Sequence, residues 1–311
     1  DADNKRLDLL ISSNKGALVC WGKTSGGHFT PPTFTGIDEH LLDAEFVEVT
    51  GDGHPDVVAL PHPGSGNNPA KVAVHRQLTE DGVGLRQFEL LEEWEIGFDP
   101  FMLAVGDMNN DGLDDILVAD TDQEQSIAML VHTGKSDADE SPENFYEPAQ
   151  FLTGVGKTTF MTAADVNGDE VPDIVMASDT LGTVSVYLNS GDGVFLMAHD
   201  TLLLGKDIPF LETGDFNSDG LEDVVVFISD LKAAYEMDGL GNGYFDGLEM
   251  GLMTLEEFGQ ANMSGVLGVN PGGGPVNVGA KLVSCGEESN SLAAADFNAD
   301  GDLDFASANG K

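Results

Sequence analysis

Acidic and amide side chains recur in this chain at alternate positions of a nine-residue segment. The pattern is Asp-x-Asn-x-Asp-Gly-x-x-Asp, and its clear copies span residues 107–115, 165–173, 215–223 and 296–304. Oxygen atoms presented at positions 1, 3 and 5 of a tight loop can converge on one point, and Ca²⁺ takes six to eight such oxygens. The residue types and their spacing therefore predict calcium sites.

Each position of the segment has an expected role. Positions 1, 3 and 5 supply side-chain oxygens, position 7 supplies a main-chain carbonyl, and Asp at position 9 can bind with both oxygens. Glycine at position 6 permits the sharp reversal of the chain. The predicted side-chain ligands of the clear copies are Asp107, Asn109, Asp111, Asp115, Asp165, Asn167, Asp169, Asp173, Asp215, Asn217, Asp219, Asp223, Asp296, Asn298, Asp300 and Asp304.

Other copies depart from the pattern. A weaker copy spans residues 48–56, and its predicted ligands are Glu48, Thr50, Asp52 and Asp56. Thr50 offers only a hydroxyl at position 3. One clear copy has Glu170 at position 6, where a side chain is expected to strain the backbone. A remnant near the N-terminus retains Asn4 and Asp8 and is not expected to bind an ion by itself. The chain thus predicts four to five bound Ca²⁺ ions.

Two other interpretations compete with calcium binding in these loops. An EF-hand requires a bidentate Glu at position 12 between two helices, whereas position 12 is Val118, Met176, Val226 or Ser307 in the clear copies. Asp, Asn and Gly also form turns without any ion. Four copies with every side-chain position filled favour calcium over a simple turn. Softer metals are not expected, because they prefer Cys or His ligands.

Short apolar runs flank each loop and must position it. Residues 103–106 precede one loop and residues 116–119 follow it, and runs of this length bounded by Gly and Asp indicate buried strands. A Gly-rich segment ending in an aromatic residue lies between the loops, for example at 186–195 and 234–245. Such a segment is typical of a β-hairpin. Each repeat is therefore expected to contain four antiparallel strands, with the acidic loop between the first two.

Repeats of about 50–60 residues with four antiparallel strands are typical of propeller blades. We therefore predict an all-β, single-domain β-propeller of four-stranded antiparallel blades, incomplete in this chain and of six or seven blades in the full protein. The expected parts are a partial blade at 1–45, blades at about 46–102, 103–160, 161–210 and 211–291, and a partial blade at 292–311. An insertion is expected at about 247–275.

The loop sequences carry a family resemblance. Residues 106–112 read Gly-Asp-Met-Asn-Asn-Asp-Gly, and residues 295–301 read Ala-Asp-Phe-Asn-Ala-Asp-Gly. This repeat resembles the FG-GAP/VCBS family, which includes the propeller heads of integrin α subunits and many bacterial surface proteins. The resemblance covers nearly the whole chain and implies structural calcium ions in loops within the blades. It leaves the function open, because the family contains adhesion modules, lectin-like modules and domains attached to enzymes.

The charge balance restricts the partners. The chain has 55 Asp and Glu against 13 Lys and Arg, for a formal net charge of −42. Nucleic acid is excluded as a partner because phosphate binding needs clustered Lys and Arg. Membrane insertion is not expected, because the chain has no apolar window long enough to span a bilayer. Five Ca²⁺ ions would still leave roughly −32, so a surface adapted to a marine or halophilic habitat is also expected.

Catalytic motifs are not found in the sequence. The seven His residues form no metal-binding pair, and neither a Gly-x-Ser-x-Gly elbow nor a phosphate-binding loop occurs. We interpret Trp21 and Trp94 as packing residues between blades rather than as platforms for sugars. Cys20 and Cys285 could form one long-range disulfide, which the spacing leaves open.

These features predict a non-catalytic, calcium-stabilised extracellular module for adhesion or surface assembly. Its expected partners are a protein or glycan at the cell surface, or the remainder of a larger polypeptide, and the 247–275 insertion is the expected contact surface. Two alternatives stay open. One is the propeller of a secreted lyase or hydrolase that acts on polysaccharides, although three Arg residues make a pocket for acidic sugars hard to build. The other is a lectin.

Overall fold

The structure of the chain is a computed structural model. It describes residues 9–21, 30–37, 39–63, 70–81, 83–96, 99–120, 127–136, 144–148, 150–152, 158–178, 183–191, 194–203, 208, 210–228, 233–245, 281–284, 289–295 and 304–309. These residues form strands, turns and irregular segments, and no helix occurs among them. They accordingly contain no helix that could cross a membrane. The expected all-β class is confirmed.

The strands are short and follow one another at regular intervals. Their bounds are β1 (Leu9–Ile11), β2 (Leu18–Cys20), β3 (Thr33–Phe34), β4 (Leu41–Val47), β5 (Asp56–Pro61), β6 (Lys71–Glu80), β7 (Val83–Glu95), β8 (Pro100–Gly106), β9 (Asp115–Asp120), β10 (Ile127–Leu130), β11 (Gln150–Leu152), β12 (Phe160–Ala164), β13 (Asp173–Ser178), β14 (Thr183–Asn189), β15 (Phe195–Leu203), β16 (Phe210–Gly214), β17 (Asp223–Ile228), β18 (Ala233–Met237), β19 (Lys281–Ser284), β20 (Ser289–Ala295) and β21 (Asp304–Asn309).

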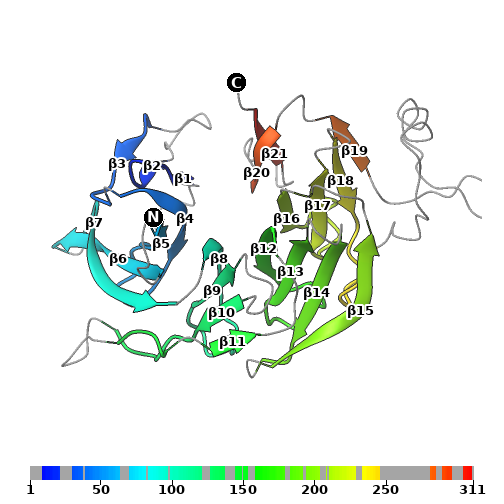
Figure 1. The fold of residues 1–311 in the computed structure, drawn as a ribbon, viewed down its shortest axis with the longest axis horizontal. Coiled ribbons are helices and arrows are strands. Elements are labelled where there is room, and N and C mark those ends of the chain that lie inside the picture. The colour runs from blue at the N-terminus through cyan, green and yellow to red at the C-terminus, as the bar shows by residue number, and fades with distance from the viewer. Residues whose placement is uncertain are drawn as a thin grey trace, which may run out of the picture. The chain divides into compact units, whose positions relative to one another are not determined.

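These strands form antiparallel sheets within two compact units, Asp1–Lys157 and Thr158–Lys311. In the first unit the strand orders are β1-β2-β3, β4-β5-β6-β7 and β8-β9-β10-β11. In the second unit they are β12-β13-β14-β15, β16-β17-β18-β19 and β20-β21. Figure 1 shows the strands of each four-stranded sheet side by side in chain order. Four sheets therefore have the strand number and order of propeller blades.

The first strand of each sheet lies against the first strand of the next sheet in the same unit. In the first unit β4 contacts both β1 and β8, and in the second unit β16 contacts both β12 and β20. Each described acidic loop follows such a first strand, as the 107–115 loop does between β8 and β9. The sheets of each unit thus pack as neighbouring blades, and the predicted β-propeller class is confirmed.

The second strand of each four-stranded blade is buried on both faces over most of its described length. Residues 116–119 of β9 are 0% exposed, and residues 224–226 of β17 are at most 2% exposed. A strand covered on both faces is expected to be continuously apolar, which explains the β-branched runs that follow the acidic loops. Because Gly106 of β8 pairs with Asp115 of β9, the two ends of the loop between them are held together.

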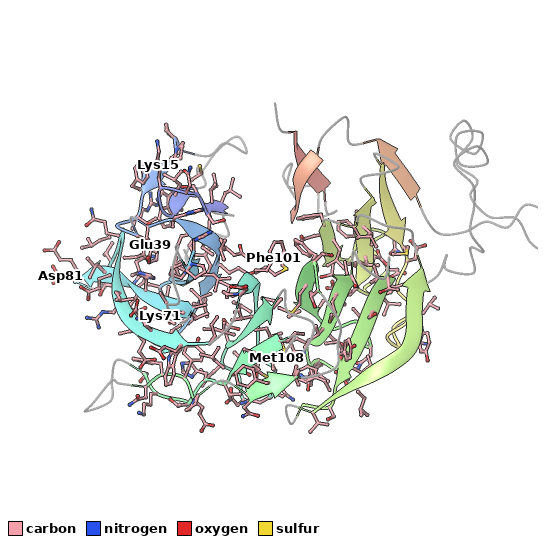
Figure 2. All side chains as sticks on the ribbon, in the orientation of Figure 1. Lys15, Glu39, Lys71, Asp81, Phe101 and Met108 are labelled. Atoms are coloured by element: carbon pink, nitrogen blue, oxygen red, sulfur yellow. The ribbon has the colours of Figure 1, made fainter. Side chains whose placement is uncertain are left out.

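The acidic loops are anchored to the core through position 2. Met108 is 0% exposed, and its counterparts in the other described loops are 1–9% exposed, namely Val49, Val166 and Phe216. Figure 2 labels Met108 just beyond the end of β8 and Phe101 near the start of that strand. Phe101 is 44% exposed, whereas residues 102–104 in the middle of the strand are buried.

Both tryptophans pack between blades, as interpreted from the sequence. Trp21 is 5% exposed and belongs to a core cluster that joins the first sheet to the β4–β7 sheet. Arg86 covers its ring, with the guanidinium carbon 4.7 Å from the ring centroid. Trp94 packs against the cluster between the β4–β7 and β8–β11 sheets, and its Nε1 donates a hydrogen bond to Glu92. A role of either ring as a sugar platform is not favoured by this packing.

Some predicted features lie outside the described residues. The 247–275 insertion, Cys285 and the ligands Asp296, Asn298 and Asp300 are among them. Asp304 is described only as the first residue of β21.

Candidate metal centres

The aspartates at position 9 form the base of each loop. Asp56, Asp115, Asp173 and Asp223 are all 0% exposed. In each, Oδ2 accepts a hydrogen bond from the amide of position 2, and Oδ1 accepts one from an amide on or just after the third strand of the blade. The four pairs have donor–acceptor distances of 2.7 to 3.2 Å. The base therefore ties the loop to the third strand.

The 107–115 loop shows this arrangement in detail. Asp115 Oδ2 lies 3.0 Å from the amide nitrogen of Met108, and Asp115 Oδ1 lies 2.7 Å from that of His132. Both amides are buried and need an acceptor. A carboxylate oxygen that accepts one N–H group retains a lone pair. Asp115 could therefore bind a cation through oxygens that also accept main-chain hydrogen bonds.

At the tip of the loop, the side chains of positions 1, 3 and 5 face inward. Asp107 accepts hydrogen bonds from the amides of Asp111 at 2.9 Å and Gly112 at 2.7 Å. Asn109 Oδ1 accepts one from Asp111, and Asp111 Oδ1 accepts one from Leu113, both at 3.0 Å. The same network recurs in the 165–173 and 215–223 loops. Three loops thus hold their oxygen donors in one repeated arrangement.

Two positions of each loop have left-handed backbone. At position 6, Gly112 has a φ of 88° and Glu170 has a φ of 69°, so the strain expected at Glu170 is confirmed. Position 4 was not recognised from the sequence. Its residues all have positive φ, for example Asn110 at 58° and Ser218 at 61°. The small or amide side chains at position 4 could have indicated this left-handed conformation from the sequence.

The carboxylates of one loop act on each other electrostatically. The pKa of Asp115 is raised to about 6, mainly by burial and in smaller part by the charges of Asp111 and Asp107. The pKa of Asp173 is also raised to about 6 by burial, with added contributions from the charges at positions 5 and 1 of its own loop. Positions 1, 5 and 9 therefore concentrate negative charge, which a cation would neutralise.

The 48–56 loop keeps the base and changes the tip. Glu48 accepts hydrogen bonds from the amides of positions 4 and 5, the first at 2.8 Å from Gly51. Burial raises its pKa to about 7, with further contributions from the charges of Asp56 and Asp52. Thr50 is 1% exposed, and its hydroxyl has no hydrogen-bond partner. Fewer side-chain oxygens therefore accept hydrogen bonds in this loop than in the 107–115 loop.

The donor set fits a hard cation. Every side-chain donor in the four described loops is an oxygen, from Asp, Glu, Asn or Thr, as Ca²⁺ prefers. In the described part of the chain, no three Asp, Glu, His or Cys side chains are already gathered closely enough to hold an ion. The carboxylates point instead to main-chain amides, so a bound cation would have to draw the tip oxygens toward one centre.

One sequence signal for the base was missed. Gln77 Nε2 donates to the carbonyl of Pro55, and Asn189 Nδ2 donates to that of Pro172, both at 3.0 Å. Gln77 and Asn189 are also the residues whose amides bind the position-9 carboxylates. Proline at position 8 thus occurs together with an amide side chain on the third strand. This pairing could have located the third-strand partner.

Comparison with solved structures shows the fold. A putative 6-phosphogluconolactonase from Bacteroides uniformis has a TM-score of 0.51 at 11% identity, and the match covers 77% of this chain and 66% of that protein. A protein of unknown function from Desulfotomaculum acetoxidans has a TM-score of 0.43 at 12% identity, with 78% and 68% covered. A glucose dehydrogenase has a TM-score of 0.44 at 12% identity, with 78% and 86% covered. This chain spans less than two thirds of the first protein.

Comparison by sequence identifies the repeat. No curated protein matches the chain. The family model of the FG-GAP-like repeat matches residues 48–118, 107–176 and 165–226. Each match begins at one acidic loop and ends a few residues beyond the next, and together the matches run without a gap over more than half of the chain. The chain therefore belongs to the FG-GAP-like repeat family, and the resemblance seen in its loops is confirmed.

Proposed function

We propose that this chain is a non-catalytic, calcium-stabilised module for extracellular adhesion or surface assembly. The observation that carries the proposal is the set of mutually repelling carboxylates at positions 1, 5 and 9, seen in the 107–115 and 165–173 loops. The inward-facing network of their tips supports it. A Ca²⁺ ion in each loop would replace this repulsion by attraction.

A bound ion would act on the fold through the two strands that the loop joins. An ion that binds only the folded state stabilises it by RT ln(1 + [L]/Kd), or about 1.4 kcal/mol per site at ten times Kd. Extracellular calcium modules commonly have dissociation constants of about 10⁻⁴ to 10⁻³ M. With constants in this range, millimolar Ca²⁺ outside cells would be needed to fill the loops, as the proposed extracellular location provides.

The surface charge favours partners that are not polyanions. The net charge of −42 repels them. Lys71 is engaged with Glu93 at 2.7 Å and Arg76 with Glu89 at 2.6 Å, so these two cations are already neutralised. Figure 2 shows Lys71 on the β6–β7 hairpin, with Asp81 at the tip of that hairpin. These observations support a protein or neutral glycan as the partner.

Native mass spectrometry and thermal unfolding of the full chain test the calcium proposal. In millimolar Ca²⁺ we expect four to five bound ions and a melting temperature well above that in excess EGTA. Mg²⁺ serves as the control and should stabilise much less, because it demands a stricter octahedral geometry. An unchanged melting curve in EGTA would contradict the proposal. Turnover of a polysaccharide by the calcium-loaded chain would contradict its non-catalytic part.

A further inference from the structure

The acidic residue at position 8 of one loop reaches the loop of the preceding blade. Asp114 Oδ2 lies 3.5 Å from the amide nitrogen of Glu48, the first residue of the 48–56 loop. Two further contacts hold the same blades together. His132 Nε2 lies 3.1 Å from the carbonyl oxygen of Val49, and Ser136 packs against Gly51. The carboxylate of Asp114 is therefore placed beside a loop that belongs to another blade.

A second observation in the 48–56 loop also indicates a ligand. Only 1% of the surface of Thr50 is exposed, and its hydroxyl oxygen has no hydrogen-bond partner. A buried hydroxyl without a hydrogen bond is unfavourable, which makes such groups rare. In the 107–115 loop the side chain at this position faces position 5 across the loop, as Asn109 faces Asp111. Thr50 stands at this same position 3, and its unpaired hydroxyl oxygen is available as a ligand.

The second unit repeats this relation between blades. Glu222 is at position 8 of the 215–223 loop, and Asp165 is the first residue of the preceding loop. Here too the carbonyl of position 2 is bound by the following blade, through the amide of Gly243 at 3.0 Å from Val166 O. Position 8 of the 48–56 and 165–173 loops is proline.

We propose that Asp114 supplies an oxygen ligand to the cation site of the 48–56 loop, so that one Ca²⁺ ion joins two neighbouring blades. The inference rests on the proposed calcium function. The loop itself offers Glu48, the hydroxyl of Thr50, Asp52 and Asp56, and it lacks the amide oxygen present at position 3 of the other described loops. A carboxylate from the next blade compensates for this weaker donor set, because calcium affinity rises with ligand charge.

The role of Asp114 reverses when the ion is absent. Without a cation, its carboxylate still faces the Glu48 amide, but its negative charge adds to that of the acidic 48–56 loop, which is unfavourable. With a cation, the same carboxylate attracts. A residue that served only to pack the two blades would stabilise the chain in both conditions.

Calcium titration of the full chain carrying Asp114→Asn tests the inference. Asparagine keeps the size of the side chain and removes its charge. Isothermal titration calorimetry with CaCl₂ should show one site weakened by about tenfold, as expected for a lost carboxylate ligand. The melting temperature should fall in Ca²⁺ and stay equal or rise in EGTA. A fall of the same size in both conditions would overturn the inference.

A double-mutant cycle with Asp52→Asn assigns the effect to the correct loop. Asp52→Asn disables the 48–56 loop, so Asp114→Asn should have no further effect in that background. An equal effect in both backgrounds would show that Asp114 acts through its own loop and would overturn the inference. If Asp52→Asn weakens a site while Asp114→Asn does not, the inference fails and the proposed function stands. If Asp52→Asn itself leaves every site unchanged, calcium binding by this loop is wrong and the inference fails with it.

Glu222→Gln provides a second variant in the other unit. It should weaken the site of the 165–173 loop in the same way, with its effect abolished by Asp169→Asn. The two position-8 variants are independent, so a folding defect in one leaves the other to decide. Unchanged calcium affinity in a folded Glu222→Gln chain would count against a ligand supplied by the next blade.

Discussion

The 48–56 and 107–115 loops lie in the same unit, and each has the same arrangement of hydrogen bonds at its base. Asp56 and Asp115 are both fully buried, and each accepts main-chain N–H groups from position 2 of its loop and from the third strand of its blade. These bonds join main-chain groups of the loop and of the third strand to the carboxylate. The base therefore belongs to the hydrogen bonding of the blade itself.

The tips of the two loops differ. In the 107–115 loop, Asp107 binds the amides of positions 5 and 6, and Asn109 faces Asp111. In the 48–56 loop, Glu48 binds the amides of positions 4 and 5, and the hydroxyl of Thr50 is unpaired. From this difference we expect that the tip would set the affinity for the proposed ion, while the base holds the blade together.

Alanine at the base is expected to have the largest effect. Asp115→Ala leaves the buried amides of Met108 and His132 without an acceptor, and each such loss is worth about 1–3 kcal/mol. We expect a loss of about 3 kcal/mol of unfolding free energy in urea, in EGTA as well as in Ca²⁺. The matched control is Asp107→Ala at the exposed tip, which should be costly only in Ca²⁺. Equal losses for the two variants in EGTA would break the distinction between base and tip.

The pH dependence should separate the two loops next. In EGTA the raised pKa values of Glu48 at about 7 and of Asp56 and Asp115 at about 6 mean that the folded state binds more protons than the unfolded state. Stability should therefore rise as the pH falls from 8 to 5, and be lost as the pH rises through these values. In saturating Ca²⁺ the trend should reverse, because protons compete with the ion.

Glu48→Gln tests whether the 48–56 loop causes the change in stability in the upper part of this pH range. Its pKa is the highest of the three, so the variant should flatten the EGTA melting profile between pH 6.5 and 8 and leave the lower part in place. Melting temperatures measured across the range provide the readout. A profile identical to that of the parent chain would remove Glu48 from the explanation.

Substitutions that disable one loop tip at a time should each remove part of the stabilisation by calcium. Asp111→Asn should remove one site and about 1.4 kcal/mol of the stabilisation at a calcium concentration ten times Kd. Asp52→Asn should remove less, because the 48–56 loop has the weaker donor set. Calcium-dependent melting of both variants gives the comparison. A greater loss from Asp52→Asn would invert the order of the two loops.

Thr50→Val changes only the unpaired hydroxyl of the 48–56 loop. Valine has the same shape and needs no hydrogen bond, so we expect about 1 kcal/mol of added stability in EGTA. In Ca²⁺ the gain should shrink or change sign, since a donor is lost. Urea unfolding in the two conditions measures both values. A loss of stability in EGTA would mean that the hydroxyl is paired in solution.

Glu170→Gly should have the smallest effect. Glu170 has a φ of 69°, whereas the corresponding position of the 107–115 loop is Gly112. Glycine removes the left-handed strain, and we expect a gain of about 1 kcal/mol or less because glycine also loses more entropy on folding. The thermal midpoint in EGTA is the measurement, with Gly112→Ala as the reciprocal variant that should destabilise. A destabilised Glu170→Gly chain would contradict the strain.

Much of the architecture was predictable because it is encoded locally. The alternation of Asp and Asn marks the loops, the runs at 116–119 and 224–226 mark strands buried on both faces, and the glycine at position 6 marks a reversal that the structure confirms. Each of these signals depends on a few neighbouring residues, so the sequence shows it directly.

The tertiary structure decided which contacts join distant parts of the chain. The third-strand amide that binds each position-9 Asp is a main-chain group, and where position 8 is not proline, as before Asp115, no signal in the sequence marks it. The approach of Asp114 to Glu48 spans 66 residues and depends on how two blades pack. By itself, the sequence determined that the chain is a repeat of acidic loops between buried strands. Only packing decided that the carboxylate at the base ties strands together and that the one at position 8 faces the preceding blade.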